Sequence, residues 1–105
     1  MASSVKITVI KKVNTNDLYE NKLPCKIADW QERECPLFNV GDEYVVKEDG
    51  FCPQGFCGWA FADIQRDVVH MLFEGSYPWI EDKGVCISCC TDGLRPVFFK
   101  LEKQD

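Results

Sequence analysis

The segment Trp59-Ala-Phe-Ala-Asp-Ile-Gln-Arg-Asp-Val-Val-His-Met-Leu-Phe-Glu74 decides the fold of this chain. Its apolar residues recur at intervals of three and four, which is the spacing of one face of an α-helix. They are Ala60, Phe61, Ile64, Val68, Met71 and Leu72. The opposite stripe is polar and is expected to face solvent, and it contains Asp63, Arg66, Asp67, His70 and Glu74. Gly75 is a suitable helix stop, so one main helix is predicted over residues 59–74.

Segments on either side of this helix have the composition of β-strands. Val5, Ile7 and Val9 alternate with polar residues and share one face of a strand. Three more strands are predicted at residues 43–47, 85–90 and 96–102. The loop 91–95 joins the last two as an antiparallel hairpin, in which Gly93 is expected to supply a positive φ. The prediction is an α+β fold, with a small, mostly antiparallel four-stranded sheet packed against one main helix.

The rest of the chain adds no second domain. Residues 14–17 read as a turn and helix start, and residues 18–34, interrupted by Pro24, read as short helical turns and loop. A chain of 105 residues has room for a single core, so residues 1–105 are predicted to form one domain.

Composition excludes some classes of partner. Twelve basic and seventeen acidic residues give a net charge of −5, and no Lys/Arg cluster is present, which argues against nucleic-acid binding. No apolar run has the length of a signal peptide or of a membrane span. We therefore expect a cytoplasmic protein without a membrane partner.

Seven cysteines in 105 residues are the strongest chemical signal. They are Cys25, Cys35, Cys52, Cys57, Cys86, Cys89 and Cys90. Such a density indicates disulfides, metal ligands or thiol chemistry. An odd count in a reducing compartment argues against a closed disulfide framework, which leaves metal binding, thiol reactivity or plain burial.

The cysteine spacing resembles two chelating pairs. Cys52-x4-Cys57 and Cys86-x2-Cys89 together would supply the four thiolates that zinc or an iron–sulfur cluster takes. A regular strand over 85–90, however, points Cys86 and Cys89 to opposite faces and puts Cys90 on the face of Cys86. A bulge or an early turn at the Cys89-Cys90 pair would restore the chelate.

Two further positions are candidates for chemistry. Cys57 precedes the helix, where unpaired N–H groups and the positive end of the dipole favour a thiolate; the alternative is a small residue filling space beneath Trp59. Asp92 and Arg95 lie in the hairpin loop, where an arginine near a thiolate would stabilise it or bind an anion; the alternative for Asp92-Gly93 is turn chemistry alone.

The remaining polar and aromatic residues have structural alternatives. His70 is expected to be a solvated surface histidine. Aromatic side chains cluster in sequence around the cysteine loop, and they either wall a dry pocket or pack in the core. They are Phe51, Phe56, Trp59, Tyr77 and Trp79. The chain carries no phosphate-binding loop, nucleophile elbow or paired-histidine zinc motif, so no enzyme class is indicated.

Several segments resemble a family of small, largely uncharacterised prokaryotic cysteine-containing proteins of about this length. The most specific is Cys89-Cys-Thr-Asp-Gly-Leu-Arg-Pro-Val97, followed by Phe99-Lys-Leu101. The others are Val5-Lys-Ile-Thr-Val-Ile-Lys-Lys12, Cys35-Pro-Leu-Phe with Gly41, Gly55-Phe-Cys-Gly-Trp-Ala60 with Asp63-Ile64, and Tyr77-Pro-Trp79. The resemblance implies that four cysteines belong to a shared pattern, namely Cys35, Cys57, Cys89 and Cys90. It also implies that Cys25, Cys52 and Cys86 are additions of this chain.

Three functional hypotheses follow. The first is a thiolate-ligated metalloprotein with a redox or accessory role, whose iron–sulfur cluster or zinc is held by Cys35, Cys57, Cys89 and Cys90, with Asp92 and Arg95 beside the cofactor. The second is a metal-free thiol-redox protein in which Cys57 is the nucleophile and Cys89 or Cys90 resolves it. The third is a non-catalytic interaction domain with buried cysteines. A protein partner or a homo-oligomer would use an exposed edge strand at residues 5–9 or 96–102.

Overall fold

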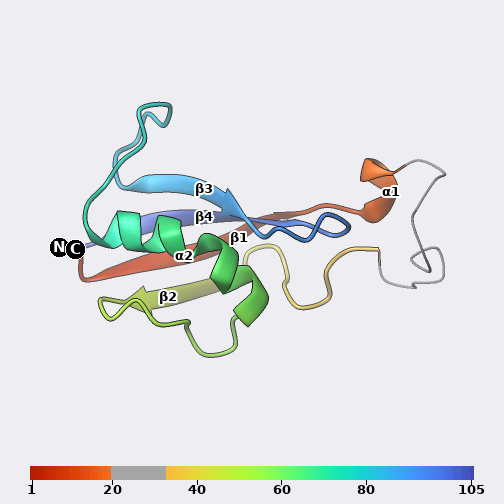
Figure 1. Cartoon of the computed structure of the whole chain (residues 1–105), viewed down its shortest axis with the longest axis horizontal. Helices are drawn as coiled ribbons and strands as arrows, with labels where there is room; N and C mark the ends of the chain where they lie inside the picture. The colour runs from red at the N-terminus through yellow and green to blue at the C-terminus, as the bar shows by residue number, and fades with distance from the viewer. Residues whose placement is uncertain (20–32) are drawn as a thin grey trace.

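Four strands form one antiparallel sheet in the computed structural model, which describes residues 1–19 and 33–105 (Figure 1). The strands are β1 (Ser4–Lys12), β2 (Glu43–Lys47), β3 (Val85–Cys89) and β4 (Val97–Gln104), in the spatial order β2-β1-β4-β3. The helices are α1 (Thr15–Leu18) and α2 (Gly58–Leu72). The predicted α+β class, the four strands and the main helix are confirmed. Cys25 and most of the turns predicted over 18–34 lie outside the described residues.

The strand order corrects the prediction about sheet edges. β1 lies between β2 and β4, and β4 lies between β1 and β3, so both are inner strands. The strands at 5–9 and 96–102 were expected to offer a free edge, but each is paired with a neighbouring strand on both sides. Among the described residues, the free edges are β2 and β3.

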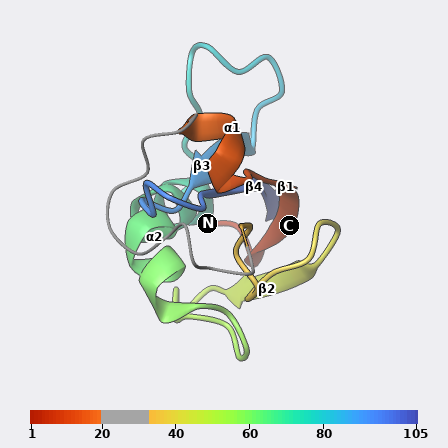
Figure 2. The same ribbon diagram turned by 90° about the vertical axis from the view of Figure 1, so that its right-hand side faces the viewer.

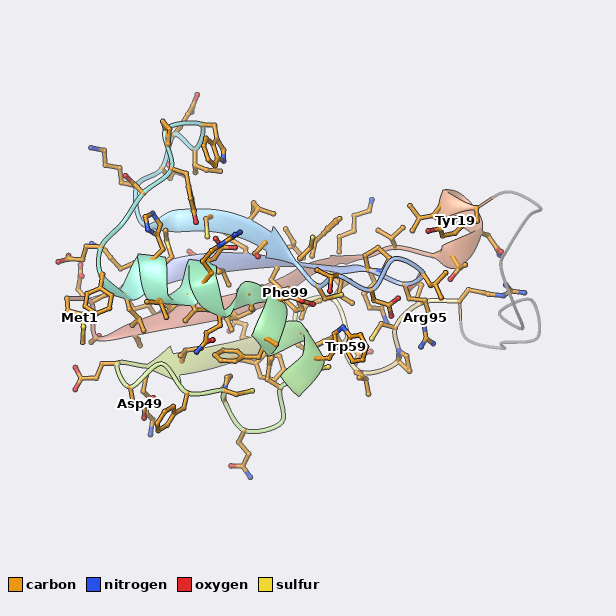
Figure 3. All side chains as sticks on the ribbon, in the orientation of Figure 1. Met1, Tyr19, Asp49, Trp59, Arg95 and Phe99 are labelled. Carbon is orange, nitrogen blue, oxygen red and sulfur yellow. The ribbon has the colours of Figure 1, made fainter. Side chains whose placement is uncertain are left out.

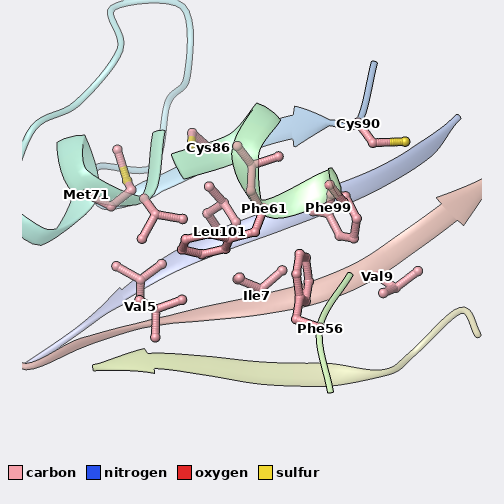
Figure 4. Close-up of a cluster of buried hydrophobic side chains, with 14 of the residues drawn as sticks. Val5, Ile7, Val9, Phe56, Phe61, Met71, Cys86, Cys90, Phe99 and Leu101 are labelled. Carbon is pink, nitrogen blue, oxygen red and sulfur yellow. The ribbon is translucent and has the colours of Figure 1, made fainter. Parts of the chain in front are cut away.

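Helix α2 covers one face of the sheet and builds the core with it (Figure 4). All six apolar residues of the predicted helical stripe are buried. They pack on alternate strand residues such as Ile7, Phe99 and Leu101, each with no exposed area. Phe38 and Phe56 enter the same core from the loops before and after β2, and their rings lie 5.1 Å apart. Within residues 1–19 and 33–105, no helix has the length and apolarity to cross a membrane.

The polar stripe of α2 is only partly as predicted. Asp67 was expected in solvent but is 7% exposed. Its carboxylate accepts hydrogen bonds from the Tyr77 hydroxyl at 2.5 Å and the Ser88 hydroxyl at 2.7 Å. His70 is half-buried rather than solvated, because its ring packs on that of Tyr77 with a centroid separation of 4.6 Å. A buried carboxylate is costly unless it has hydrogen-bond partners, and the two hydroxyl donors offset this cost for Asp67.

The C-terminus of α2 is made differently from the prediction. Glu74, and not Gly75, adopts the positive φ of 62°. The Gly75 amide donates to the His70 carbonyl at 2.8 Å, and the imidazole of His70 occupies the space that a side chain on Gly75 would need. Glycine is therefore required here for a close approach and not for its backbone conformation.

The hairpin loop between β3 and β4 also departs from the prediction. Gly93 does not have a positive φ. Instead, one carboxylate oxygen of Asp92 accepts hydrogen bonds from the backbone amides of Leu94 at 2.9 Å and Arg95 at 3.2 Å. The aspartate side chain therefore stabilises the turn. The expectation that Asp92 serves turn chemistry is confirmed.

A β-bulge near the end of β1 changes which side chains face the helix. Val9 pairs with Phe99, but Lys11 pairs with Phe98, so one residue of β1 is extra. Ile10 and Lys11 are consequently exposed, and Lys12 lies opposite the buried Val97 on the helix side of the sheet. The bulge directs the Lys12 ammonium toward the loop that precedes β2.

Two long loops extend from the ends of α2 to opposite sides of the molecule (Figure 2). One leads from β2 into α2 and contains Cys52 and Cys57, and the other leads from α2 to β3 and contains Tyr77 and Trp79. Each loop supplies residues to the lining of one cavity.

Candidate functional site

Three of the four cysteines in the predicted ligand set line one cavity at the N-terminal end of α2. Cys35, Cys57 and Cys90 come from three separate segments of the chain. The cavity, here called the cysteine cavity, has a volume of about 530 Å³. Its other lining residues are Pro36, Leu37, Phe38, Trp59, Ala60, Thr91, Asp92, Gly93, Leu94, Arg95 and Val97. Most of the exposed area of this lining is apolar.

Cys57 occupies the N-cap position of α2, as the sequence suggested. Its backbone is extended, with φ of −63° and ψ of 120°, and its side chain makes no capping hydrogen bond. The sulfur is half-buried on the cavity wall. A thiolate at this position would lie at the positive end of the helix dipole.

Cys90 follows β3 and is 7% exposed. Its amide donates to the Val97 carbonyl at 3.1 Å, and its sulfur accepts a hydrogen bond from the Val97 amide at 3.3 Å. A backbone N–H directed at a sulfur stabilises negative charge on it. Cys90 is therefore a buried cavity residue whose sulfur is held by a backbone N–H.

Cys35 lies on a loop that the Lys12 ammonium holds in place. The ammonium donates to the carbonyls of Cys35 at 3.0 Å and Phe38 at 2.8 Å, and Glu34 lies 3.9 Å away. Only 15% of the Lys12 side chain is exposed. Phe38 anchors the same loop in the core, with its ring 5.2 Å from that of Phe99. The Cys35 wall is thus fixed by one buried cation and one buried ring.

The hairpin loop forms the opposite wall, and hydrogen bonds hold it on several sides. The Asp63 carboxylate accepts from the Thr91 amide at 2.7 Å and from the Thr91 hydroxyl at 2.9 Å. Tyr19 donates to the Gly93 carbonyl at 2.7 Å, and Thr15 donates to the Leu94 carbonyl at 2.8 Å. These contacts restrict the movement of the wall relative to α2 and α1.

Trp59 and Arg95 lie at the same end of the sheet and line the cavity from α2 and from the hairpin loop (Figure 3). Trp59 is 72% exposed, whereas Arg95 is half-buried. Asp92 and Arg95, which the sequence analysis placed beside candidate thiols, line the same cavity as Cys57 and Cys90. Of the clustered aromatics, Phe56 is in the core, and Phe51, Trp59 and Trp79 are exposed.

Cys89 does not line the cysteine cavity. It is exposed on the sheet face opposite Cys90, as strand alternation predicted. Partial desolvation of its sulfur, followed by the neighbouring Cys90, Asp63 and Asp67, raises the pKa of Cys89. Among residues 1–19 and 33–105, no group of three or more His, Cys, Asp or Glu side chains is placed to hold a metal ion.

The cysteines that the resemblance sets apart have different surroundings. Cys52 is exposed in the loop before α2, and desolvation and the nearby Cys57 raise its pKa. Cys86 is buried beside Asp67, and burial, followed by the charge of Asp67, raises the pKa of Cys86 to about 12. Neither cysteine lines the cysteine cavity.

Several residues build the site through contacts that the sequence did not indicate. Lys12, Asp63 and Tyr19 all hold cavity walls, yet each contacts a partner 23 to 74 residues away in the chain. Lys12 and Asp63 belong to segments that carry the resemblance, but nothing in those segments indicated their partners, and the polar stripe of α2 predicted exposure of Asp63 rather than a hydrogen bond to Thr91. Such pairings depend on the sheet order and the bulge, which local patterns do not encode.

The fold and this cavity together define a small α+β protein with a thiol-lined cavity at a helix N-terminus. Comparison with known proteins adds no relative: no protein-family model, no curated protein and no solved structure matches the chain.

Proposed function

We propose that this is a thiol-dependent protein whose working site is the cysteine cavity and whose reactive thiol is Cys57. The observation that carries the proposal is the convergence of Cys35, Cys57 and Cys90 on one largely apolar cavity. Cys57 is the best placed of the three for attack because it occupies the N-cap position of α2, at the positive end of the helix dipole, and its side chain is not engaged in a capping hydrogen bond.

The reaction class that fits these groups is thiol–disulfide exchange. The Cys57 thiolate attacks one sulfur of a disulfide substrate, the substrate S–S bond breaks, and the leaving sulfur departs as a thiolate. Cys90 or Cys35 then attacks the Cys57 sulfur and releases the second half of the substrate. The substrate gains two electrons, the protein acquires one disulfide, and an external dithiol returns the protein to its reduced form.

The proposal is tested by measuring the alkylation rate of each cysteine by peptide mass spectrometry at neutral pH. Cys57 is expected to react faster than Cys52, which is more exposed but has a raised pKa. The Cys52→Ser variant should keep the fast reaction, and Cys57→Ser should lose it. Equal rates at Cys57 and Cys52 would remove the basis of the proposal.

A metal centre is the second candidate function, because three thiols on one cavity are close to the number that zinc or an iron–sulfur cluster takes. The ligand set would be Cys35, Cys57 and Cys90 with a fourth group, and Cys89 would have to leave its present face to supply it. Elemental analysis and an absorption spectrum of protein purified without oxygen test this. Stoichiometric metal that is lost in Cys57→Ser and Cys90→Ser would support the metal centre, and metal retained in both variants would exclude this ligand set.

A further inference from the structure

A second cavity, on the side of α2 toward β3, has a buried carboxylate at its base and aromatic rings at its mouth. It has a volume of about 440 Å³ and is here called the Asp67 pocket. Its lining residues are Arg66, Asp67, His70, Tyr77, Trp79, Ile80, Cys86 and Ile87. The cysteine cavity shares none of these residues, so the two sites are separate.

The rings form a continuous column. Tyr77 stacks on Trp79 with centroids 5.0 Å apart and an interplanar angle of 21°, and His70 packs on Tyr77 at 4.6 Å. Trp79 is nevertheless 75% exposed. A stacked yet exposed indole offers an ordered flat surface to a ligand at a small further cost in side-chain entropy.

Contacts with the rest of the protein hold His70 and Tyr77, two members of this column, in place. The imidazole of His70 fits against Gly75, which has no side chain, and His70 Nε2 lies 3.2 Å from the Ser76 carbonyl oxygen. The Tyr77 hydroxyl is fixed on Asp67. His70 and Tyr77 are therefore each held by contacts within the protein, and Trp79 is positioned by stacking on Tyr77.

The base of the pocket carries a negative charge with remaining hydrogen-bonding capacity. Each Asp67 oxygen accepts one hydroxyl, from Tyr77 or from Ser88, and an ionised carboxylate can accept about four hydrogen bonds. Arg66 does not use that capacity, because its Nε stays 4.0 Å from the carboxylate and its side chain is 87% exposed. The charge of the pocket is thus only weakly compensated.

We propose that the Asp67 pocket binds a guanidinium group. A guanidinium is a planar cation that stacks on aromatic faces and donates paired hydrogen bonds to a carboxylate, so it matches both the ring column and Asp67. The net charge of −5 on the chain favours a cationic ligand over an anionic one. The group belongs either to a small molecule or to an arginine side chain of a peptide.

The test is an NMR titration of the full-length protein that follows the indole N–H signals. Arginine amide is expected to shift the Trp79 signal saturably, with a dissociation constant on the order of a few millimolar. Citrulline amide keeps the α-ammonium group and has a similar shape, but a neutral urea replaces its guanidinium, and it is expected not to bind. Equal binding of citrulline amide, or of lysine amide, would overturn the guanidinium assignment.

Variants locate the site. Trp79→Ala is expected to weaken binding about fivefold, and Asp67→Asn about tenfold. Trp59→Ala is the matched control, because it removes an equally exposed indole from the other cavity and should leave the affinity unchanged. If Trp59→Ala weakened binding as much as Trp79→Ala, the pocket would be wrongly placed. Because Trp79 is exposed, this outcome does not depend on whether the Asp67 variant folds.

A blocked Gly-Arg-Gly peptide separates the two sources of the group. Tighter binding of the peptide than of arginine amide would assign an arginine side chain of a partner, and tighter binding of arginine amide would assign a small molecule. Either result supports the proposal, whereas no saturable shift with either compound below about 50 mM would reject it.

Discussion

Cys86 and Cys90 lie four residues apart on the helix side of the sheet, yet their surroundings have opposite electrostatic character. Cys86 is buried beside the Asp67 carboxylate, and burial, followed by the charge of Asp67, raises the pKa of Cys86 to about 12. Cys90 is also buried, but its sulfur accepts a hydrogen bond from the Val97 amide. One sulfur lies beside a carboxylate, and the other accepts a hydrogen bond from a backbone N–H. The comparison shows that burial alone does not decide the chemistry of a thiol, because the nearest charge or N–H group must be named as well.

The same contrast separates the two cavities as wholes. The cysteine cavity is built from loops that a lysine, an aspartate and buried rings attach to the core. The Asp67 pocket is built around one buried carboxylate that two hydroxyls satisfy. Variants that affect one cavity and spare the other test whether the two sites are independent.

The largest effect is expected from Phe38→Ala. Phe38 is 2% exposed and its ring packs on Tyr44, Phe56 and Phe99, so the variant should lose about 4 kcal/mol of unfolding free energy. Urea denaturation measures the loss, and alkylation of Cys35 should become faster while that of Cys86 stays slow in the folded protein. The exposed Phe51→Ala is the control, and a loss below about 1 kcal/mol for Phe38→Ala would show that this loop is not anchored in the core.

Asp67→Ala is expected to cost about 2 kcal/mol, because it leaves the partly buried hydroxyls of Tyr77 and Ser88 without their acceptor. Asp63→Ala, one helical turn earlier, should cost about 1 kcal/mol and should speed alkylation of Cys90 instead, since Asp63 holds Thr91. Denaturation curves and labelling rates on both variants check the pair. If Asp67→Ala also exposed Cys90, the two cavities would be mechanically coupled.

A pH effect of intermediate size is expected from Tyr77. Its hydrogen bond to Asp67, followed by desolvation and the Asp67 charge, raises the pKa of Tyr77 from 10.0 to about 12. Folding therefore favours the protonated phenol, so this stabilisation is complete below pH 10.0 and is lost as the pH rises toward about 12. In urea denaturation, the difference between the parent protein and Tyr77→Phe should shrink across that window. A difference that stayed constant would mean that the phenol does not titrate in this range.

The smallest effects on stability are expected from the two exposed indoles. Trp59→Ala and Trp79→Ala should each change the unfolding free energy by no more than about 0.5 kcal/mol. Only Trp59→Ala should raise the alkylation rate of Cys57, because only Trp59 lines the cysteine cavity. The same rise in Trp79→Ala would mean that the indole effect is not local.

Local patterns predicted the elements of this fold well. The three-and-four spacing from Ala60 to Leu72 placed α2, and strand alternation placed Cys86 and Cys90 on one face with Cys89 on the other; the structure shows that the face of Cys86 and Cys90 is the buried one. Asp67 was misassigned because it is a carboxylate, although it lies three residues after Ile64 and four before Met71, on the edge of the buried stripe. The hydroxyls that make its burial possible are 10 and 21 residues away, and only tertiary structure brings them together.

The sequence identified most of the cysteines of the candidate site, but it did not predict how the fold brings them together. The resemblance singled out Cys35, Cys57 and Cys90, and the helix boundary singled out Cys57, and all three line one cavity. The resemblance also included Cys89, which strand alternation turns to the other face. Which strands are inner and how the Cys35 loop attaches depend on sheet order, and no residue pattern in a single chain reports that order.

Because of the bulge in β1, the end of this strand should tolerate the gain or loss of one residue. Lys11 and Lys12 are identical neighbours that face opposite sides of the sheet, and the extra residue near Ile10 sets which of them faces the helix. If the bulge were smoothed out, Lys11 would take the inward place and offer the same ammonium to the Cys35 loop. Gain or loss of one residue here should therefore be nearly silent in an evolving or redesigned chain, whereas the same change at Thr8 would turn the hydrophobic face of β1 outward.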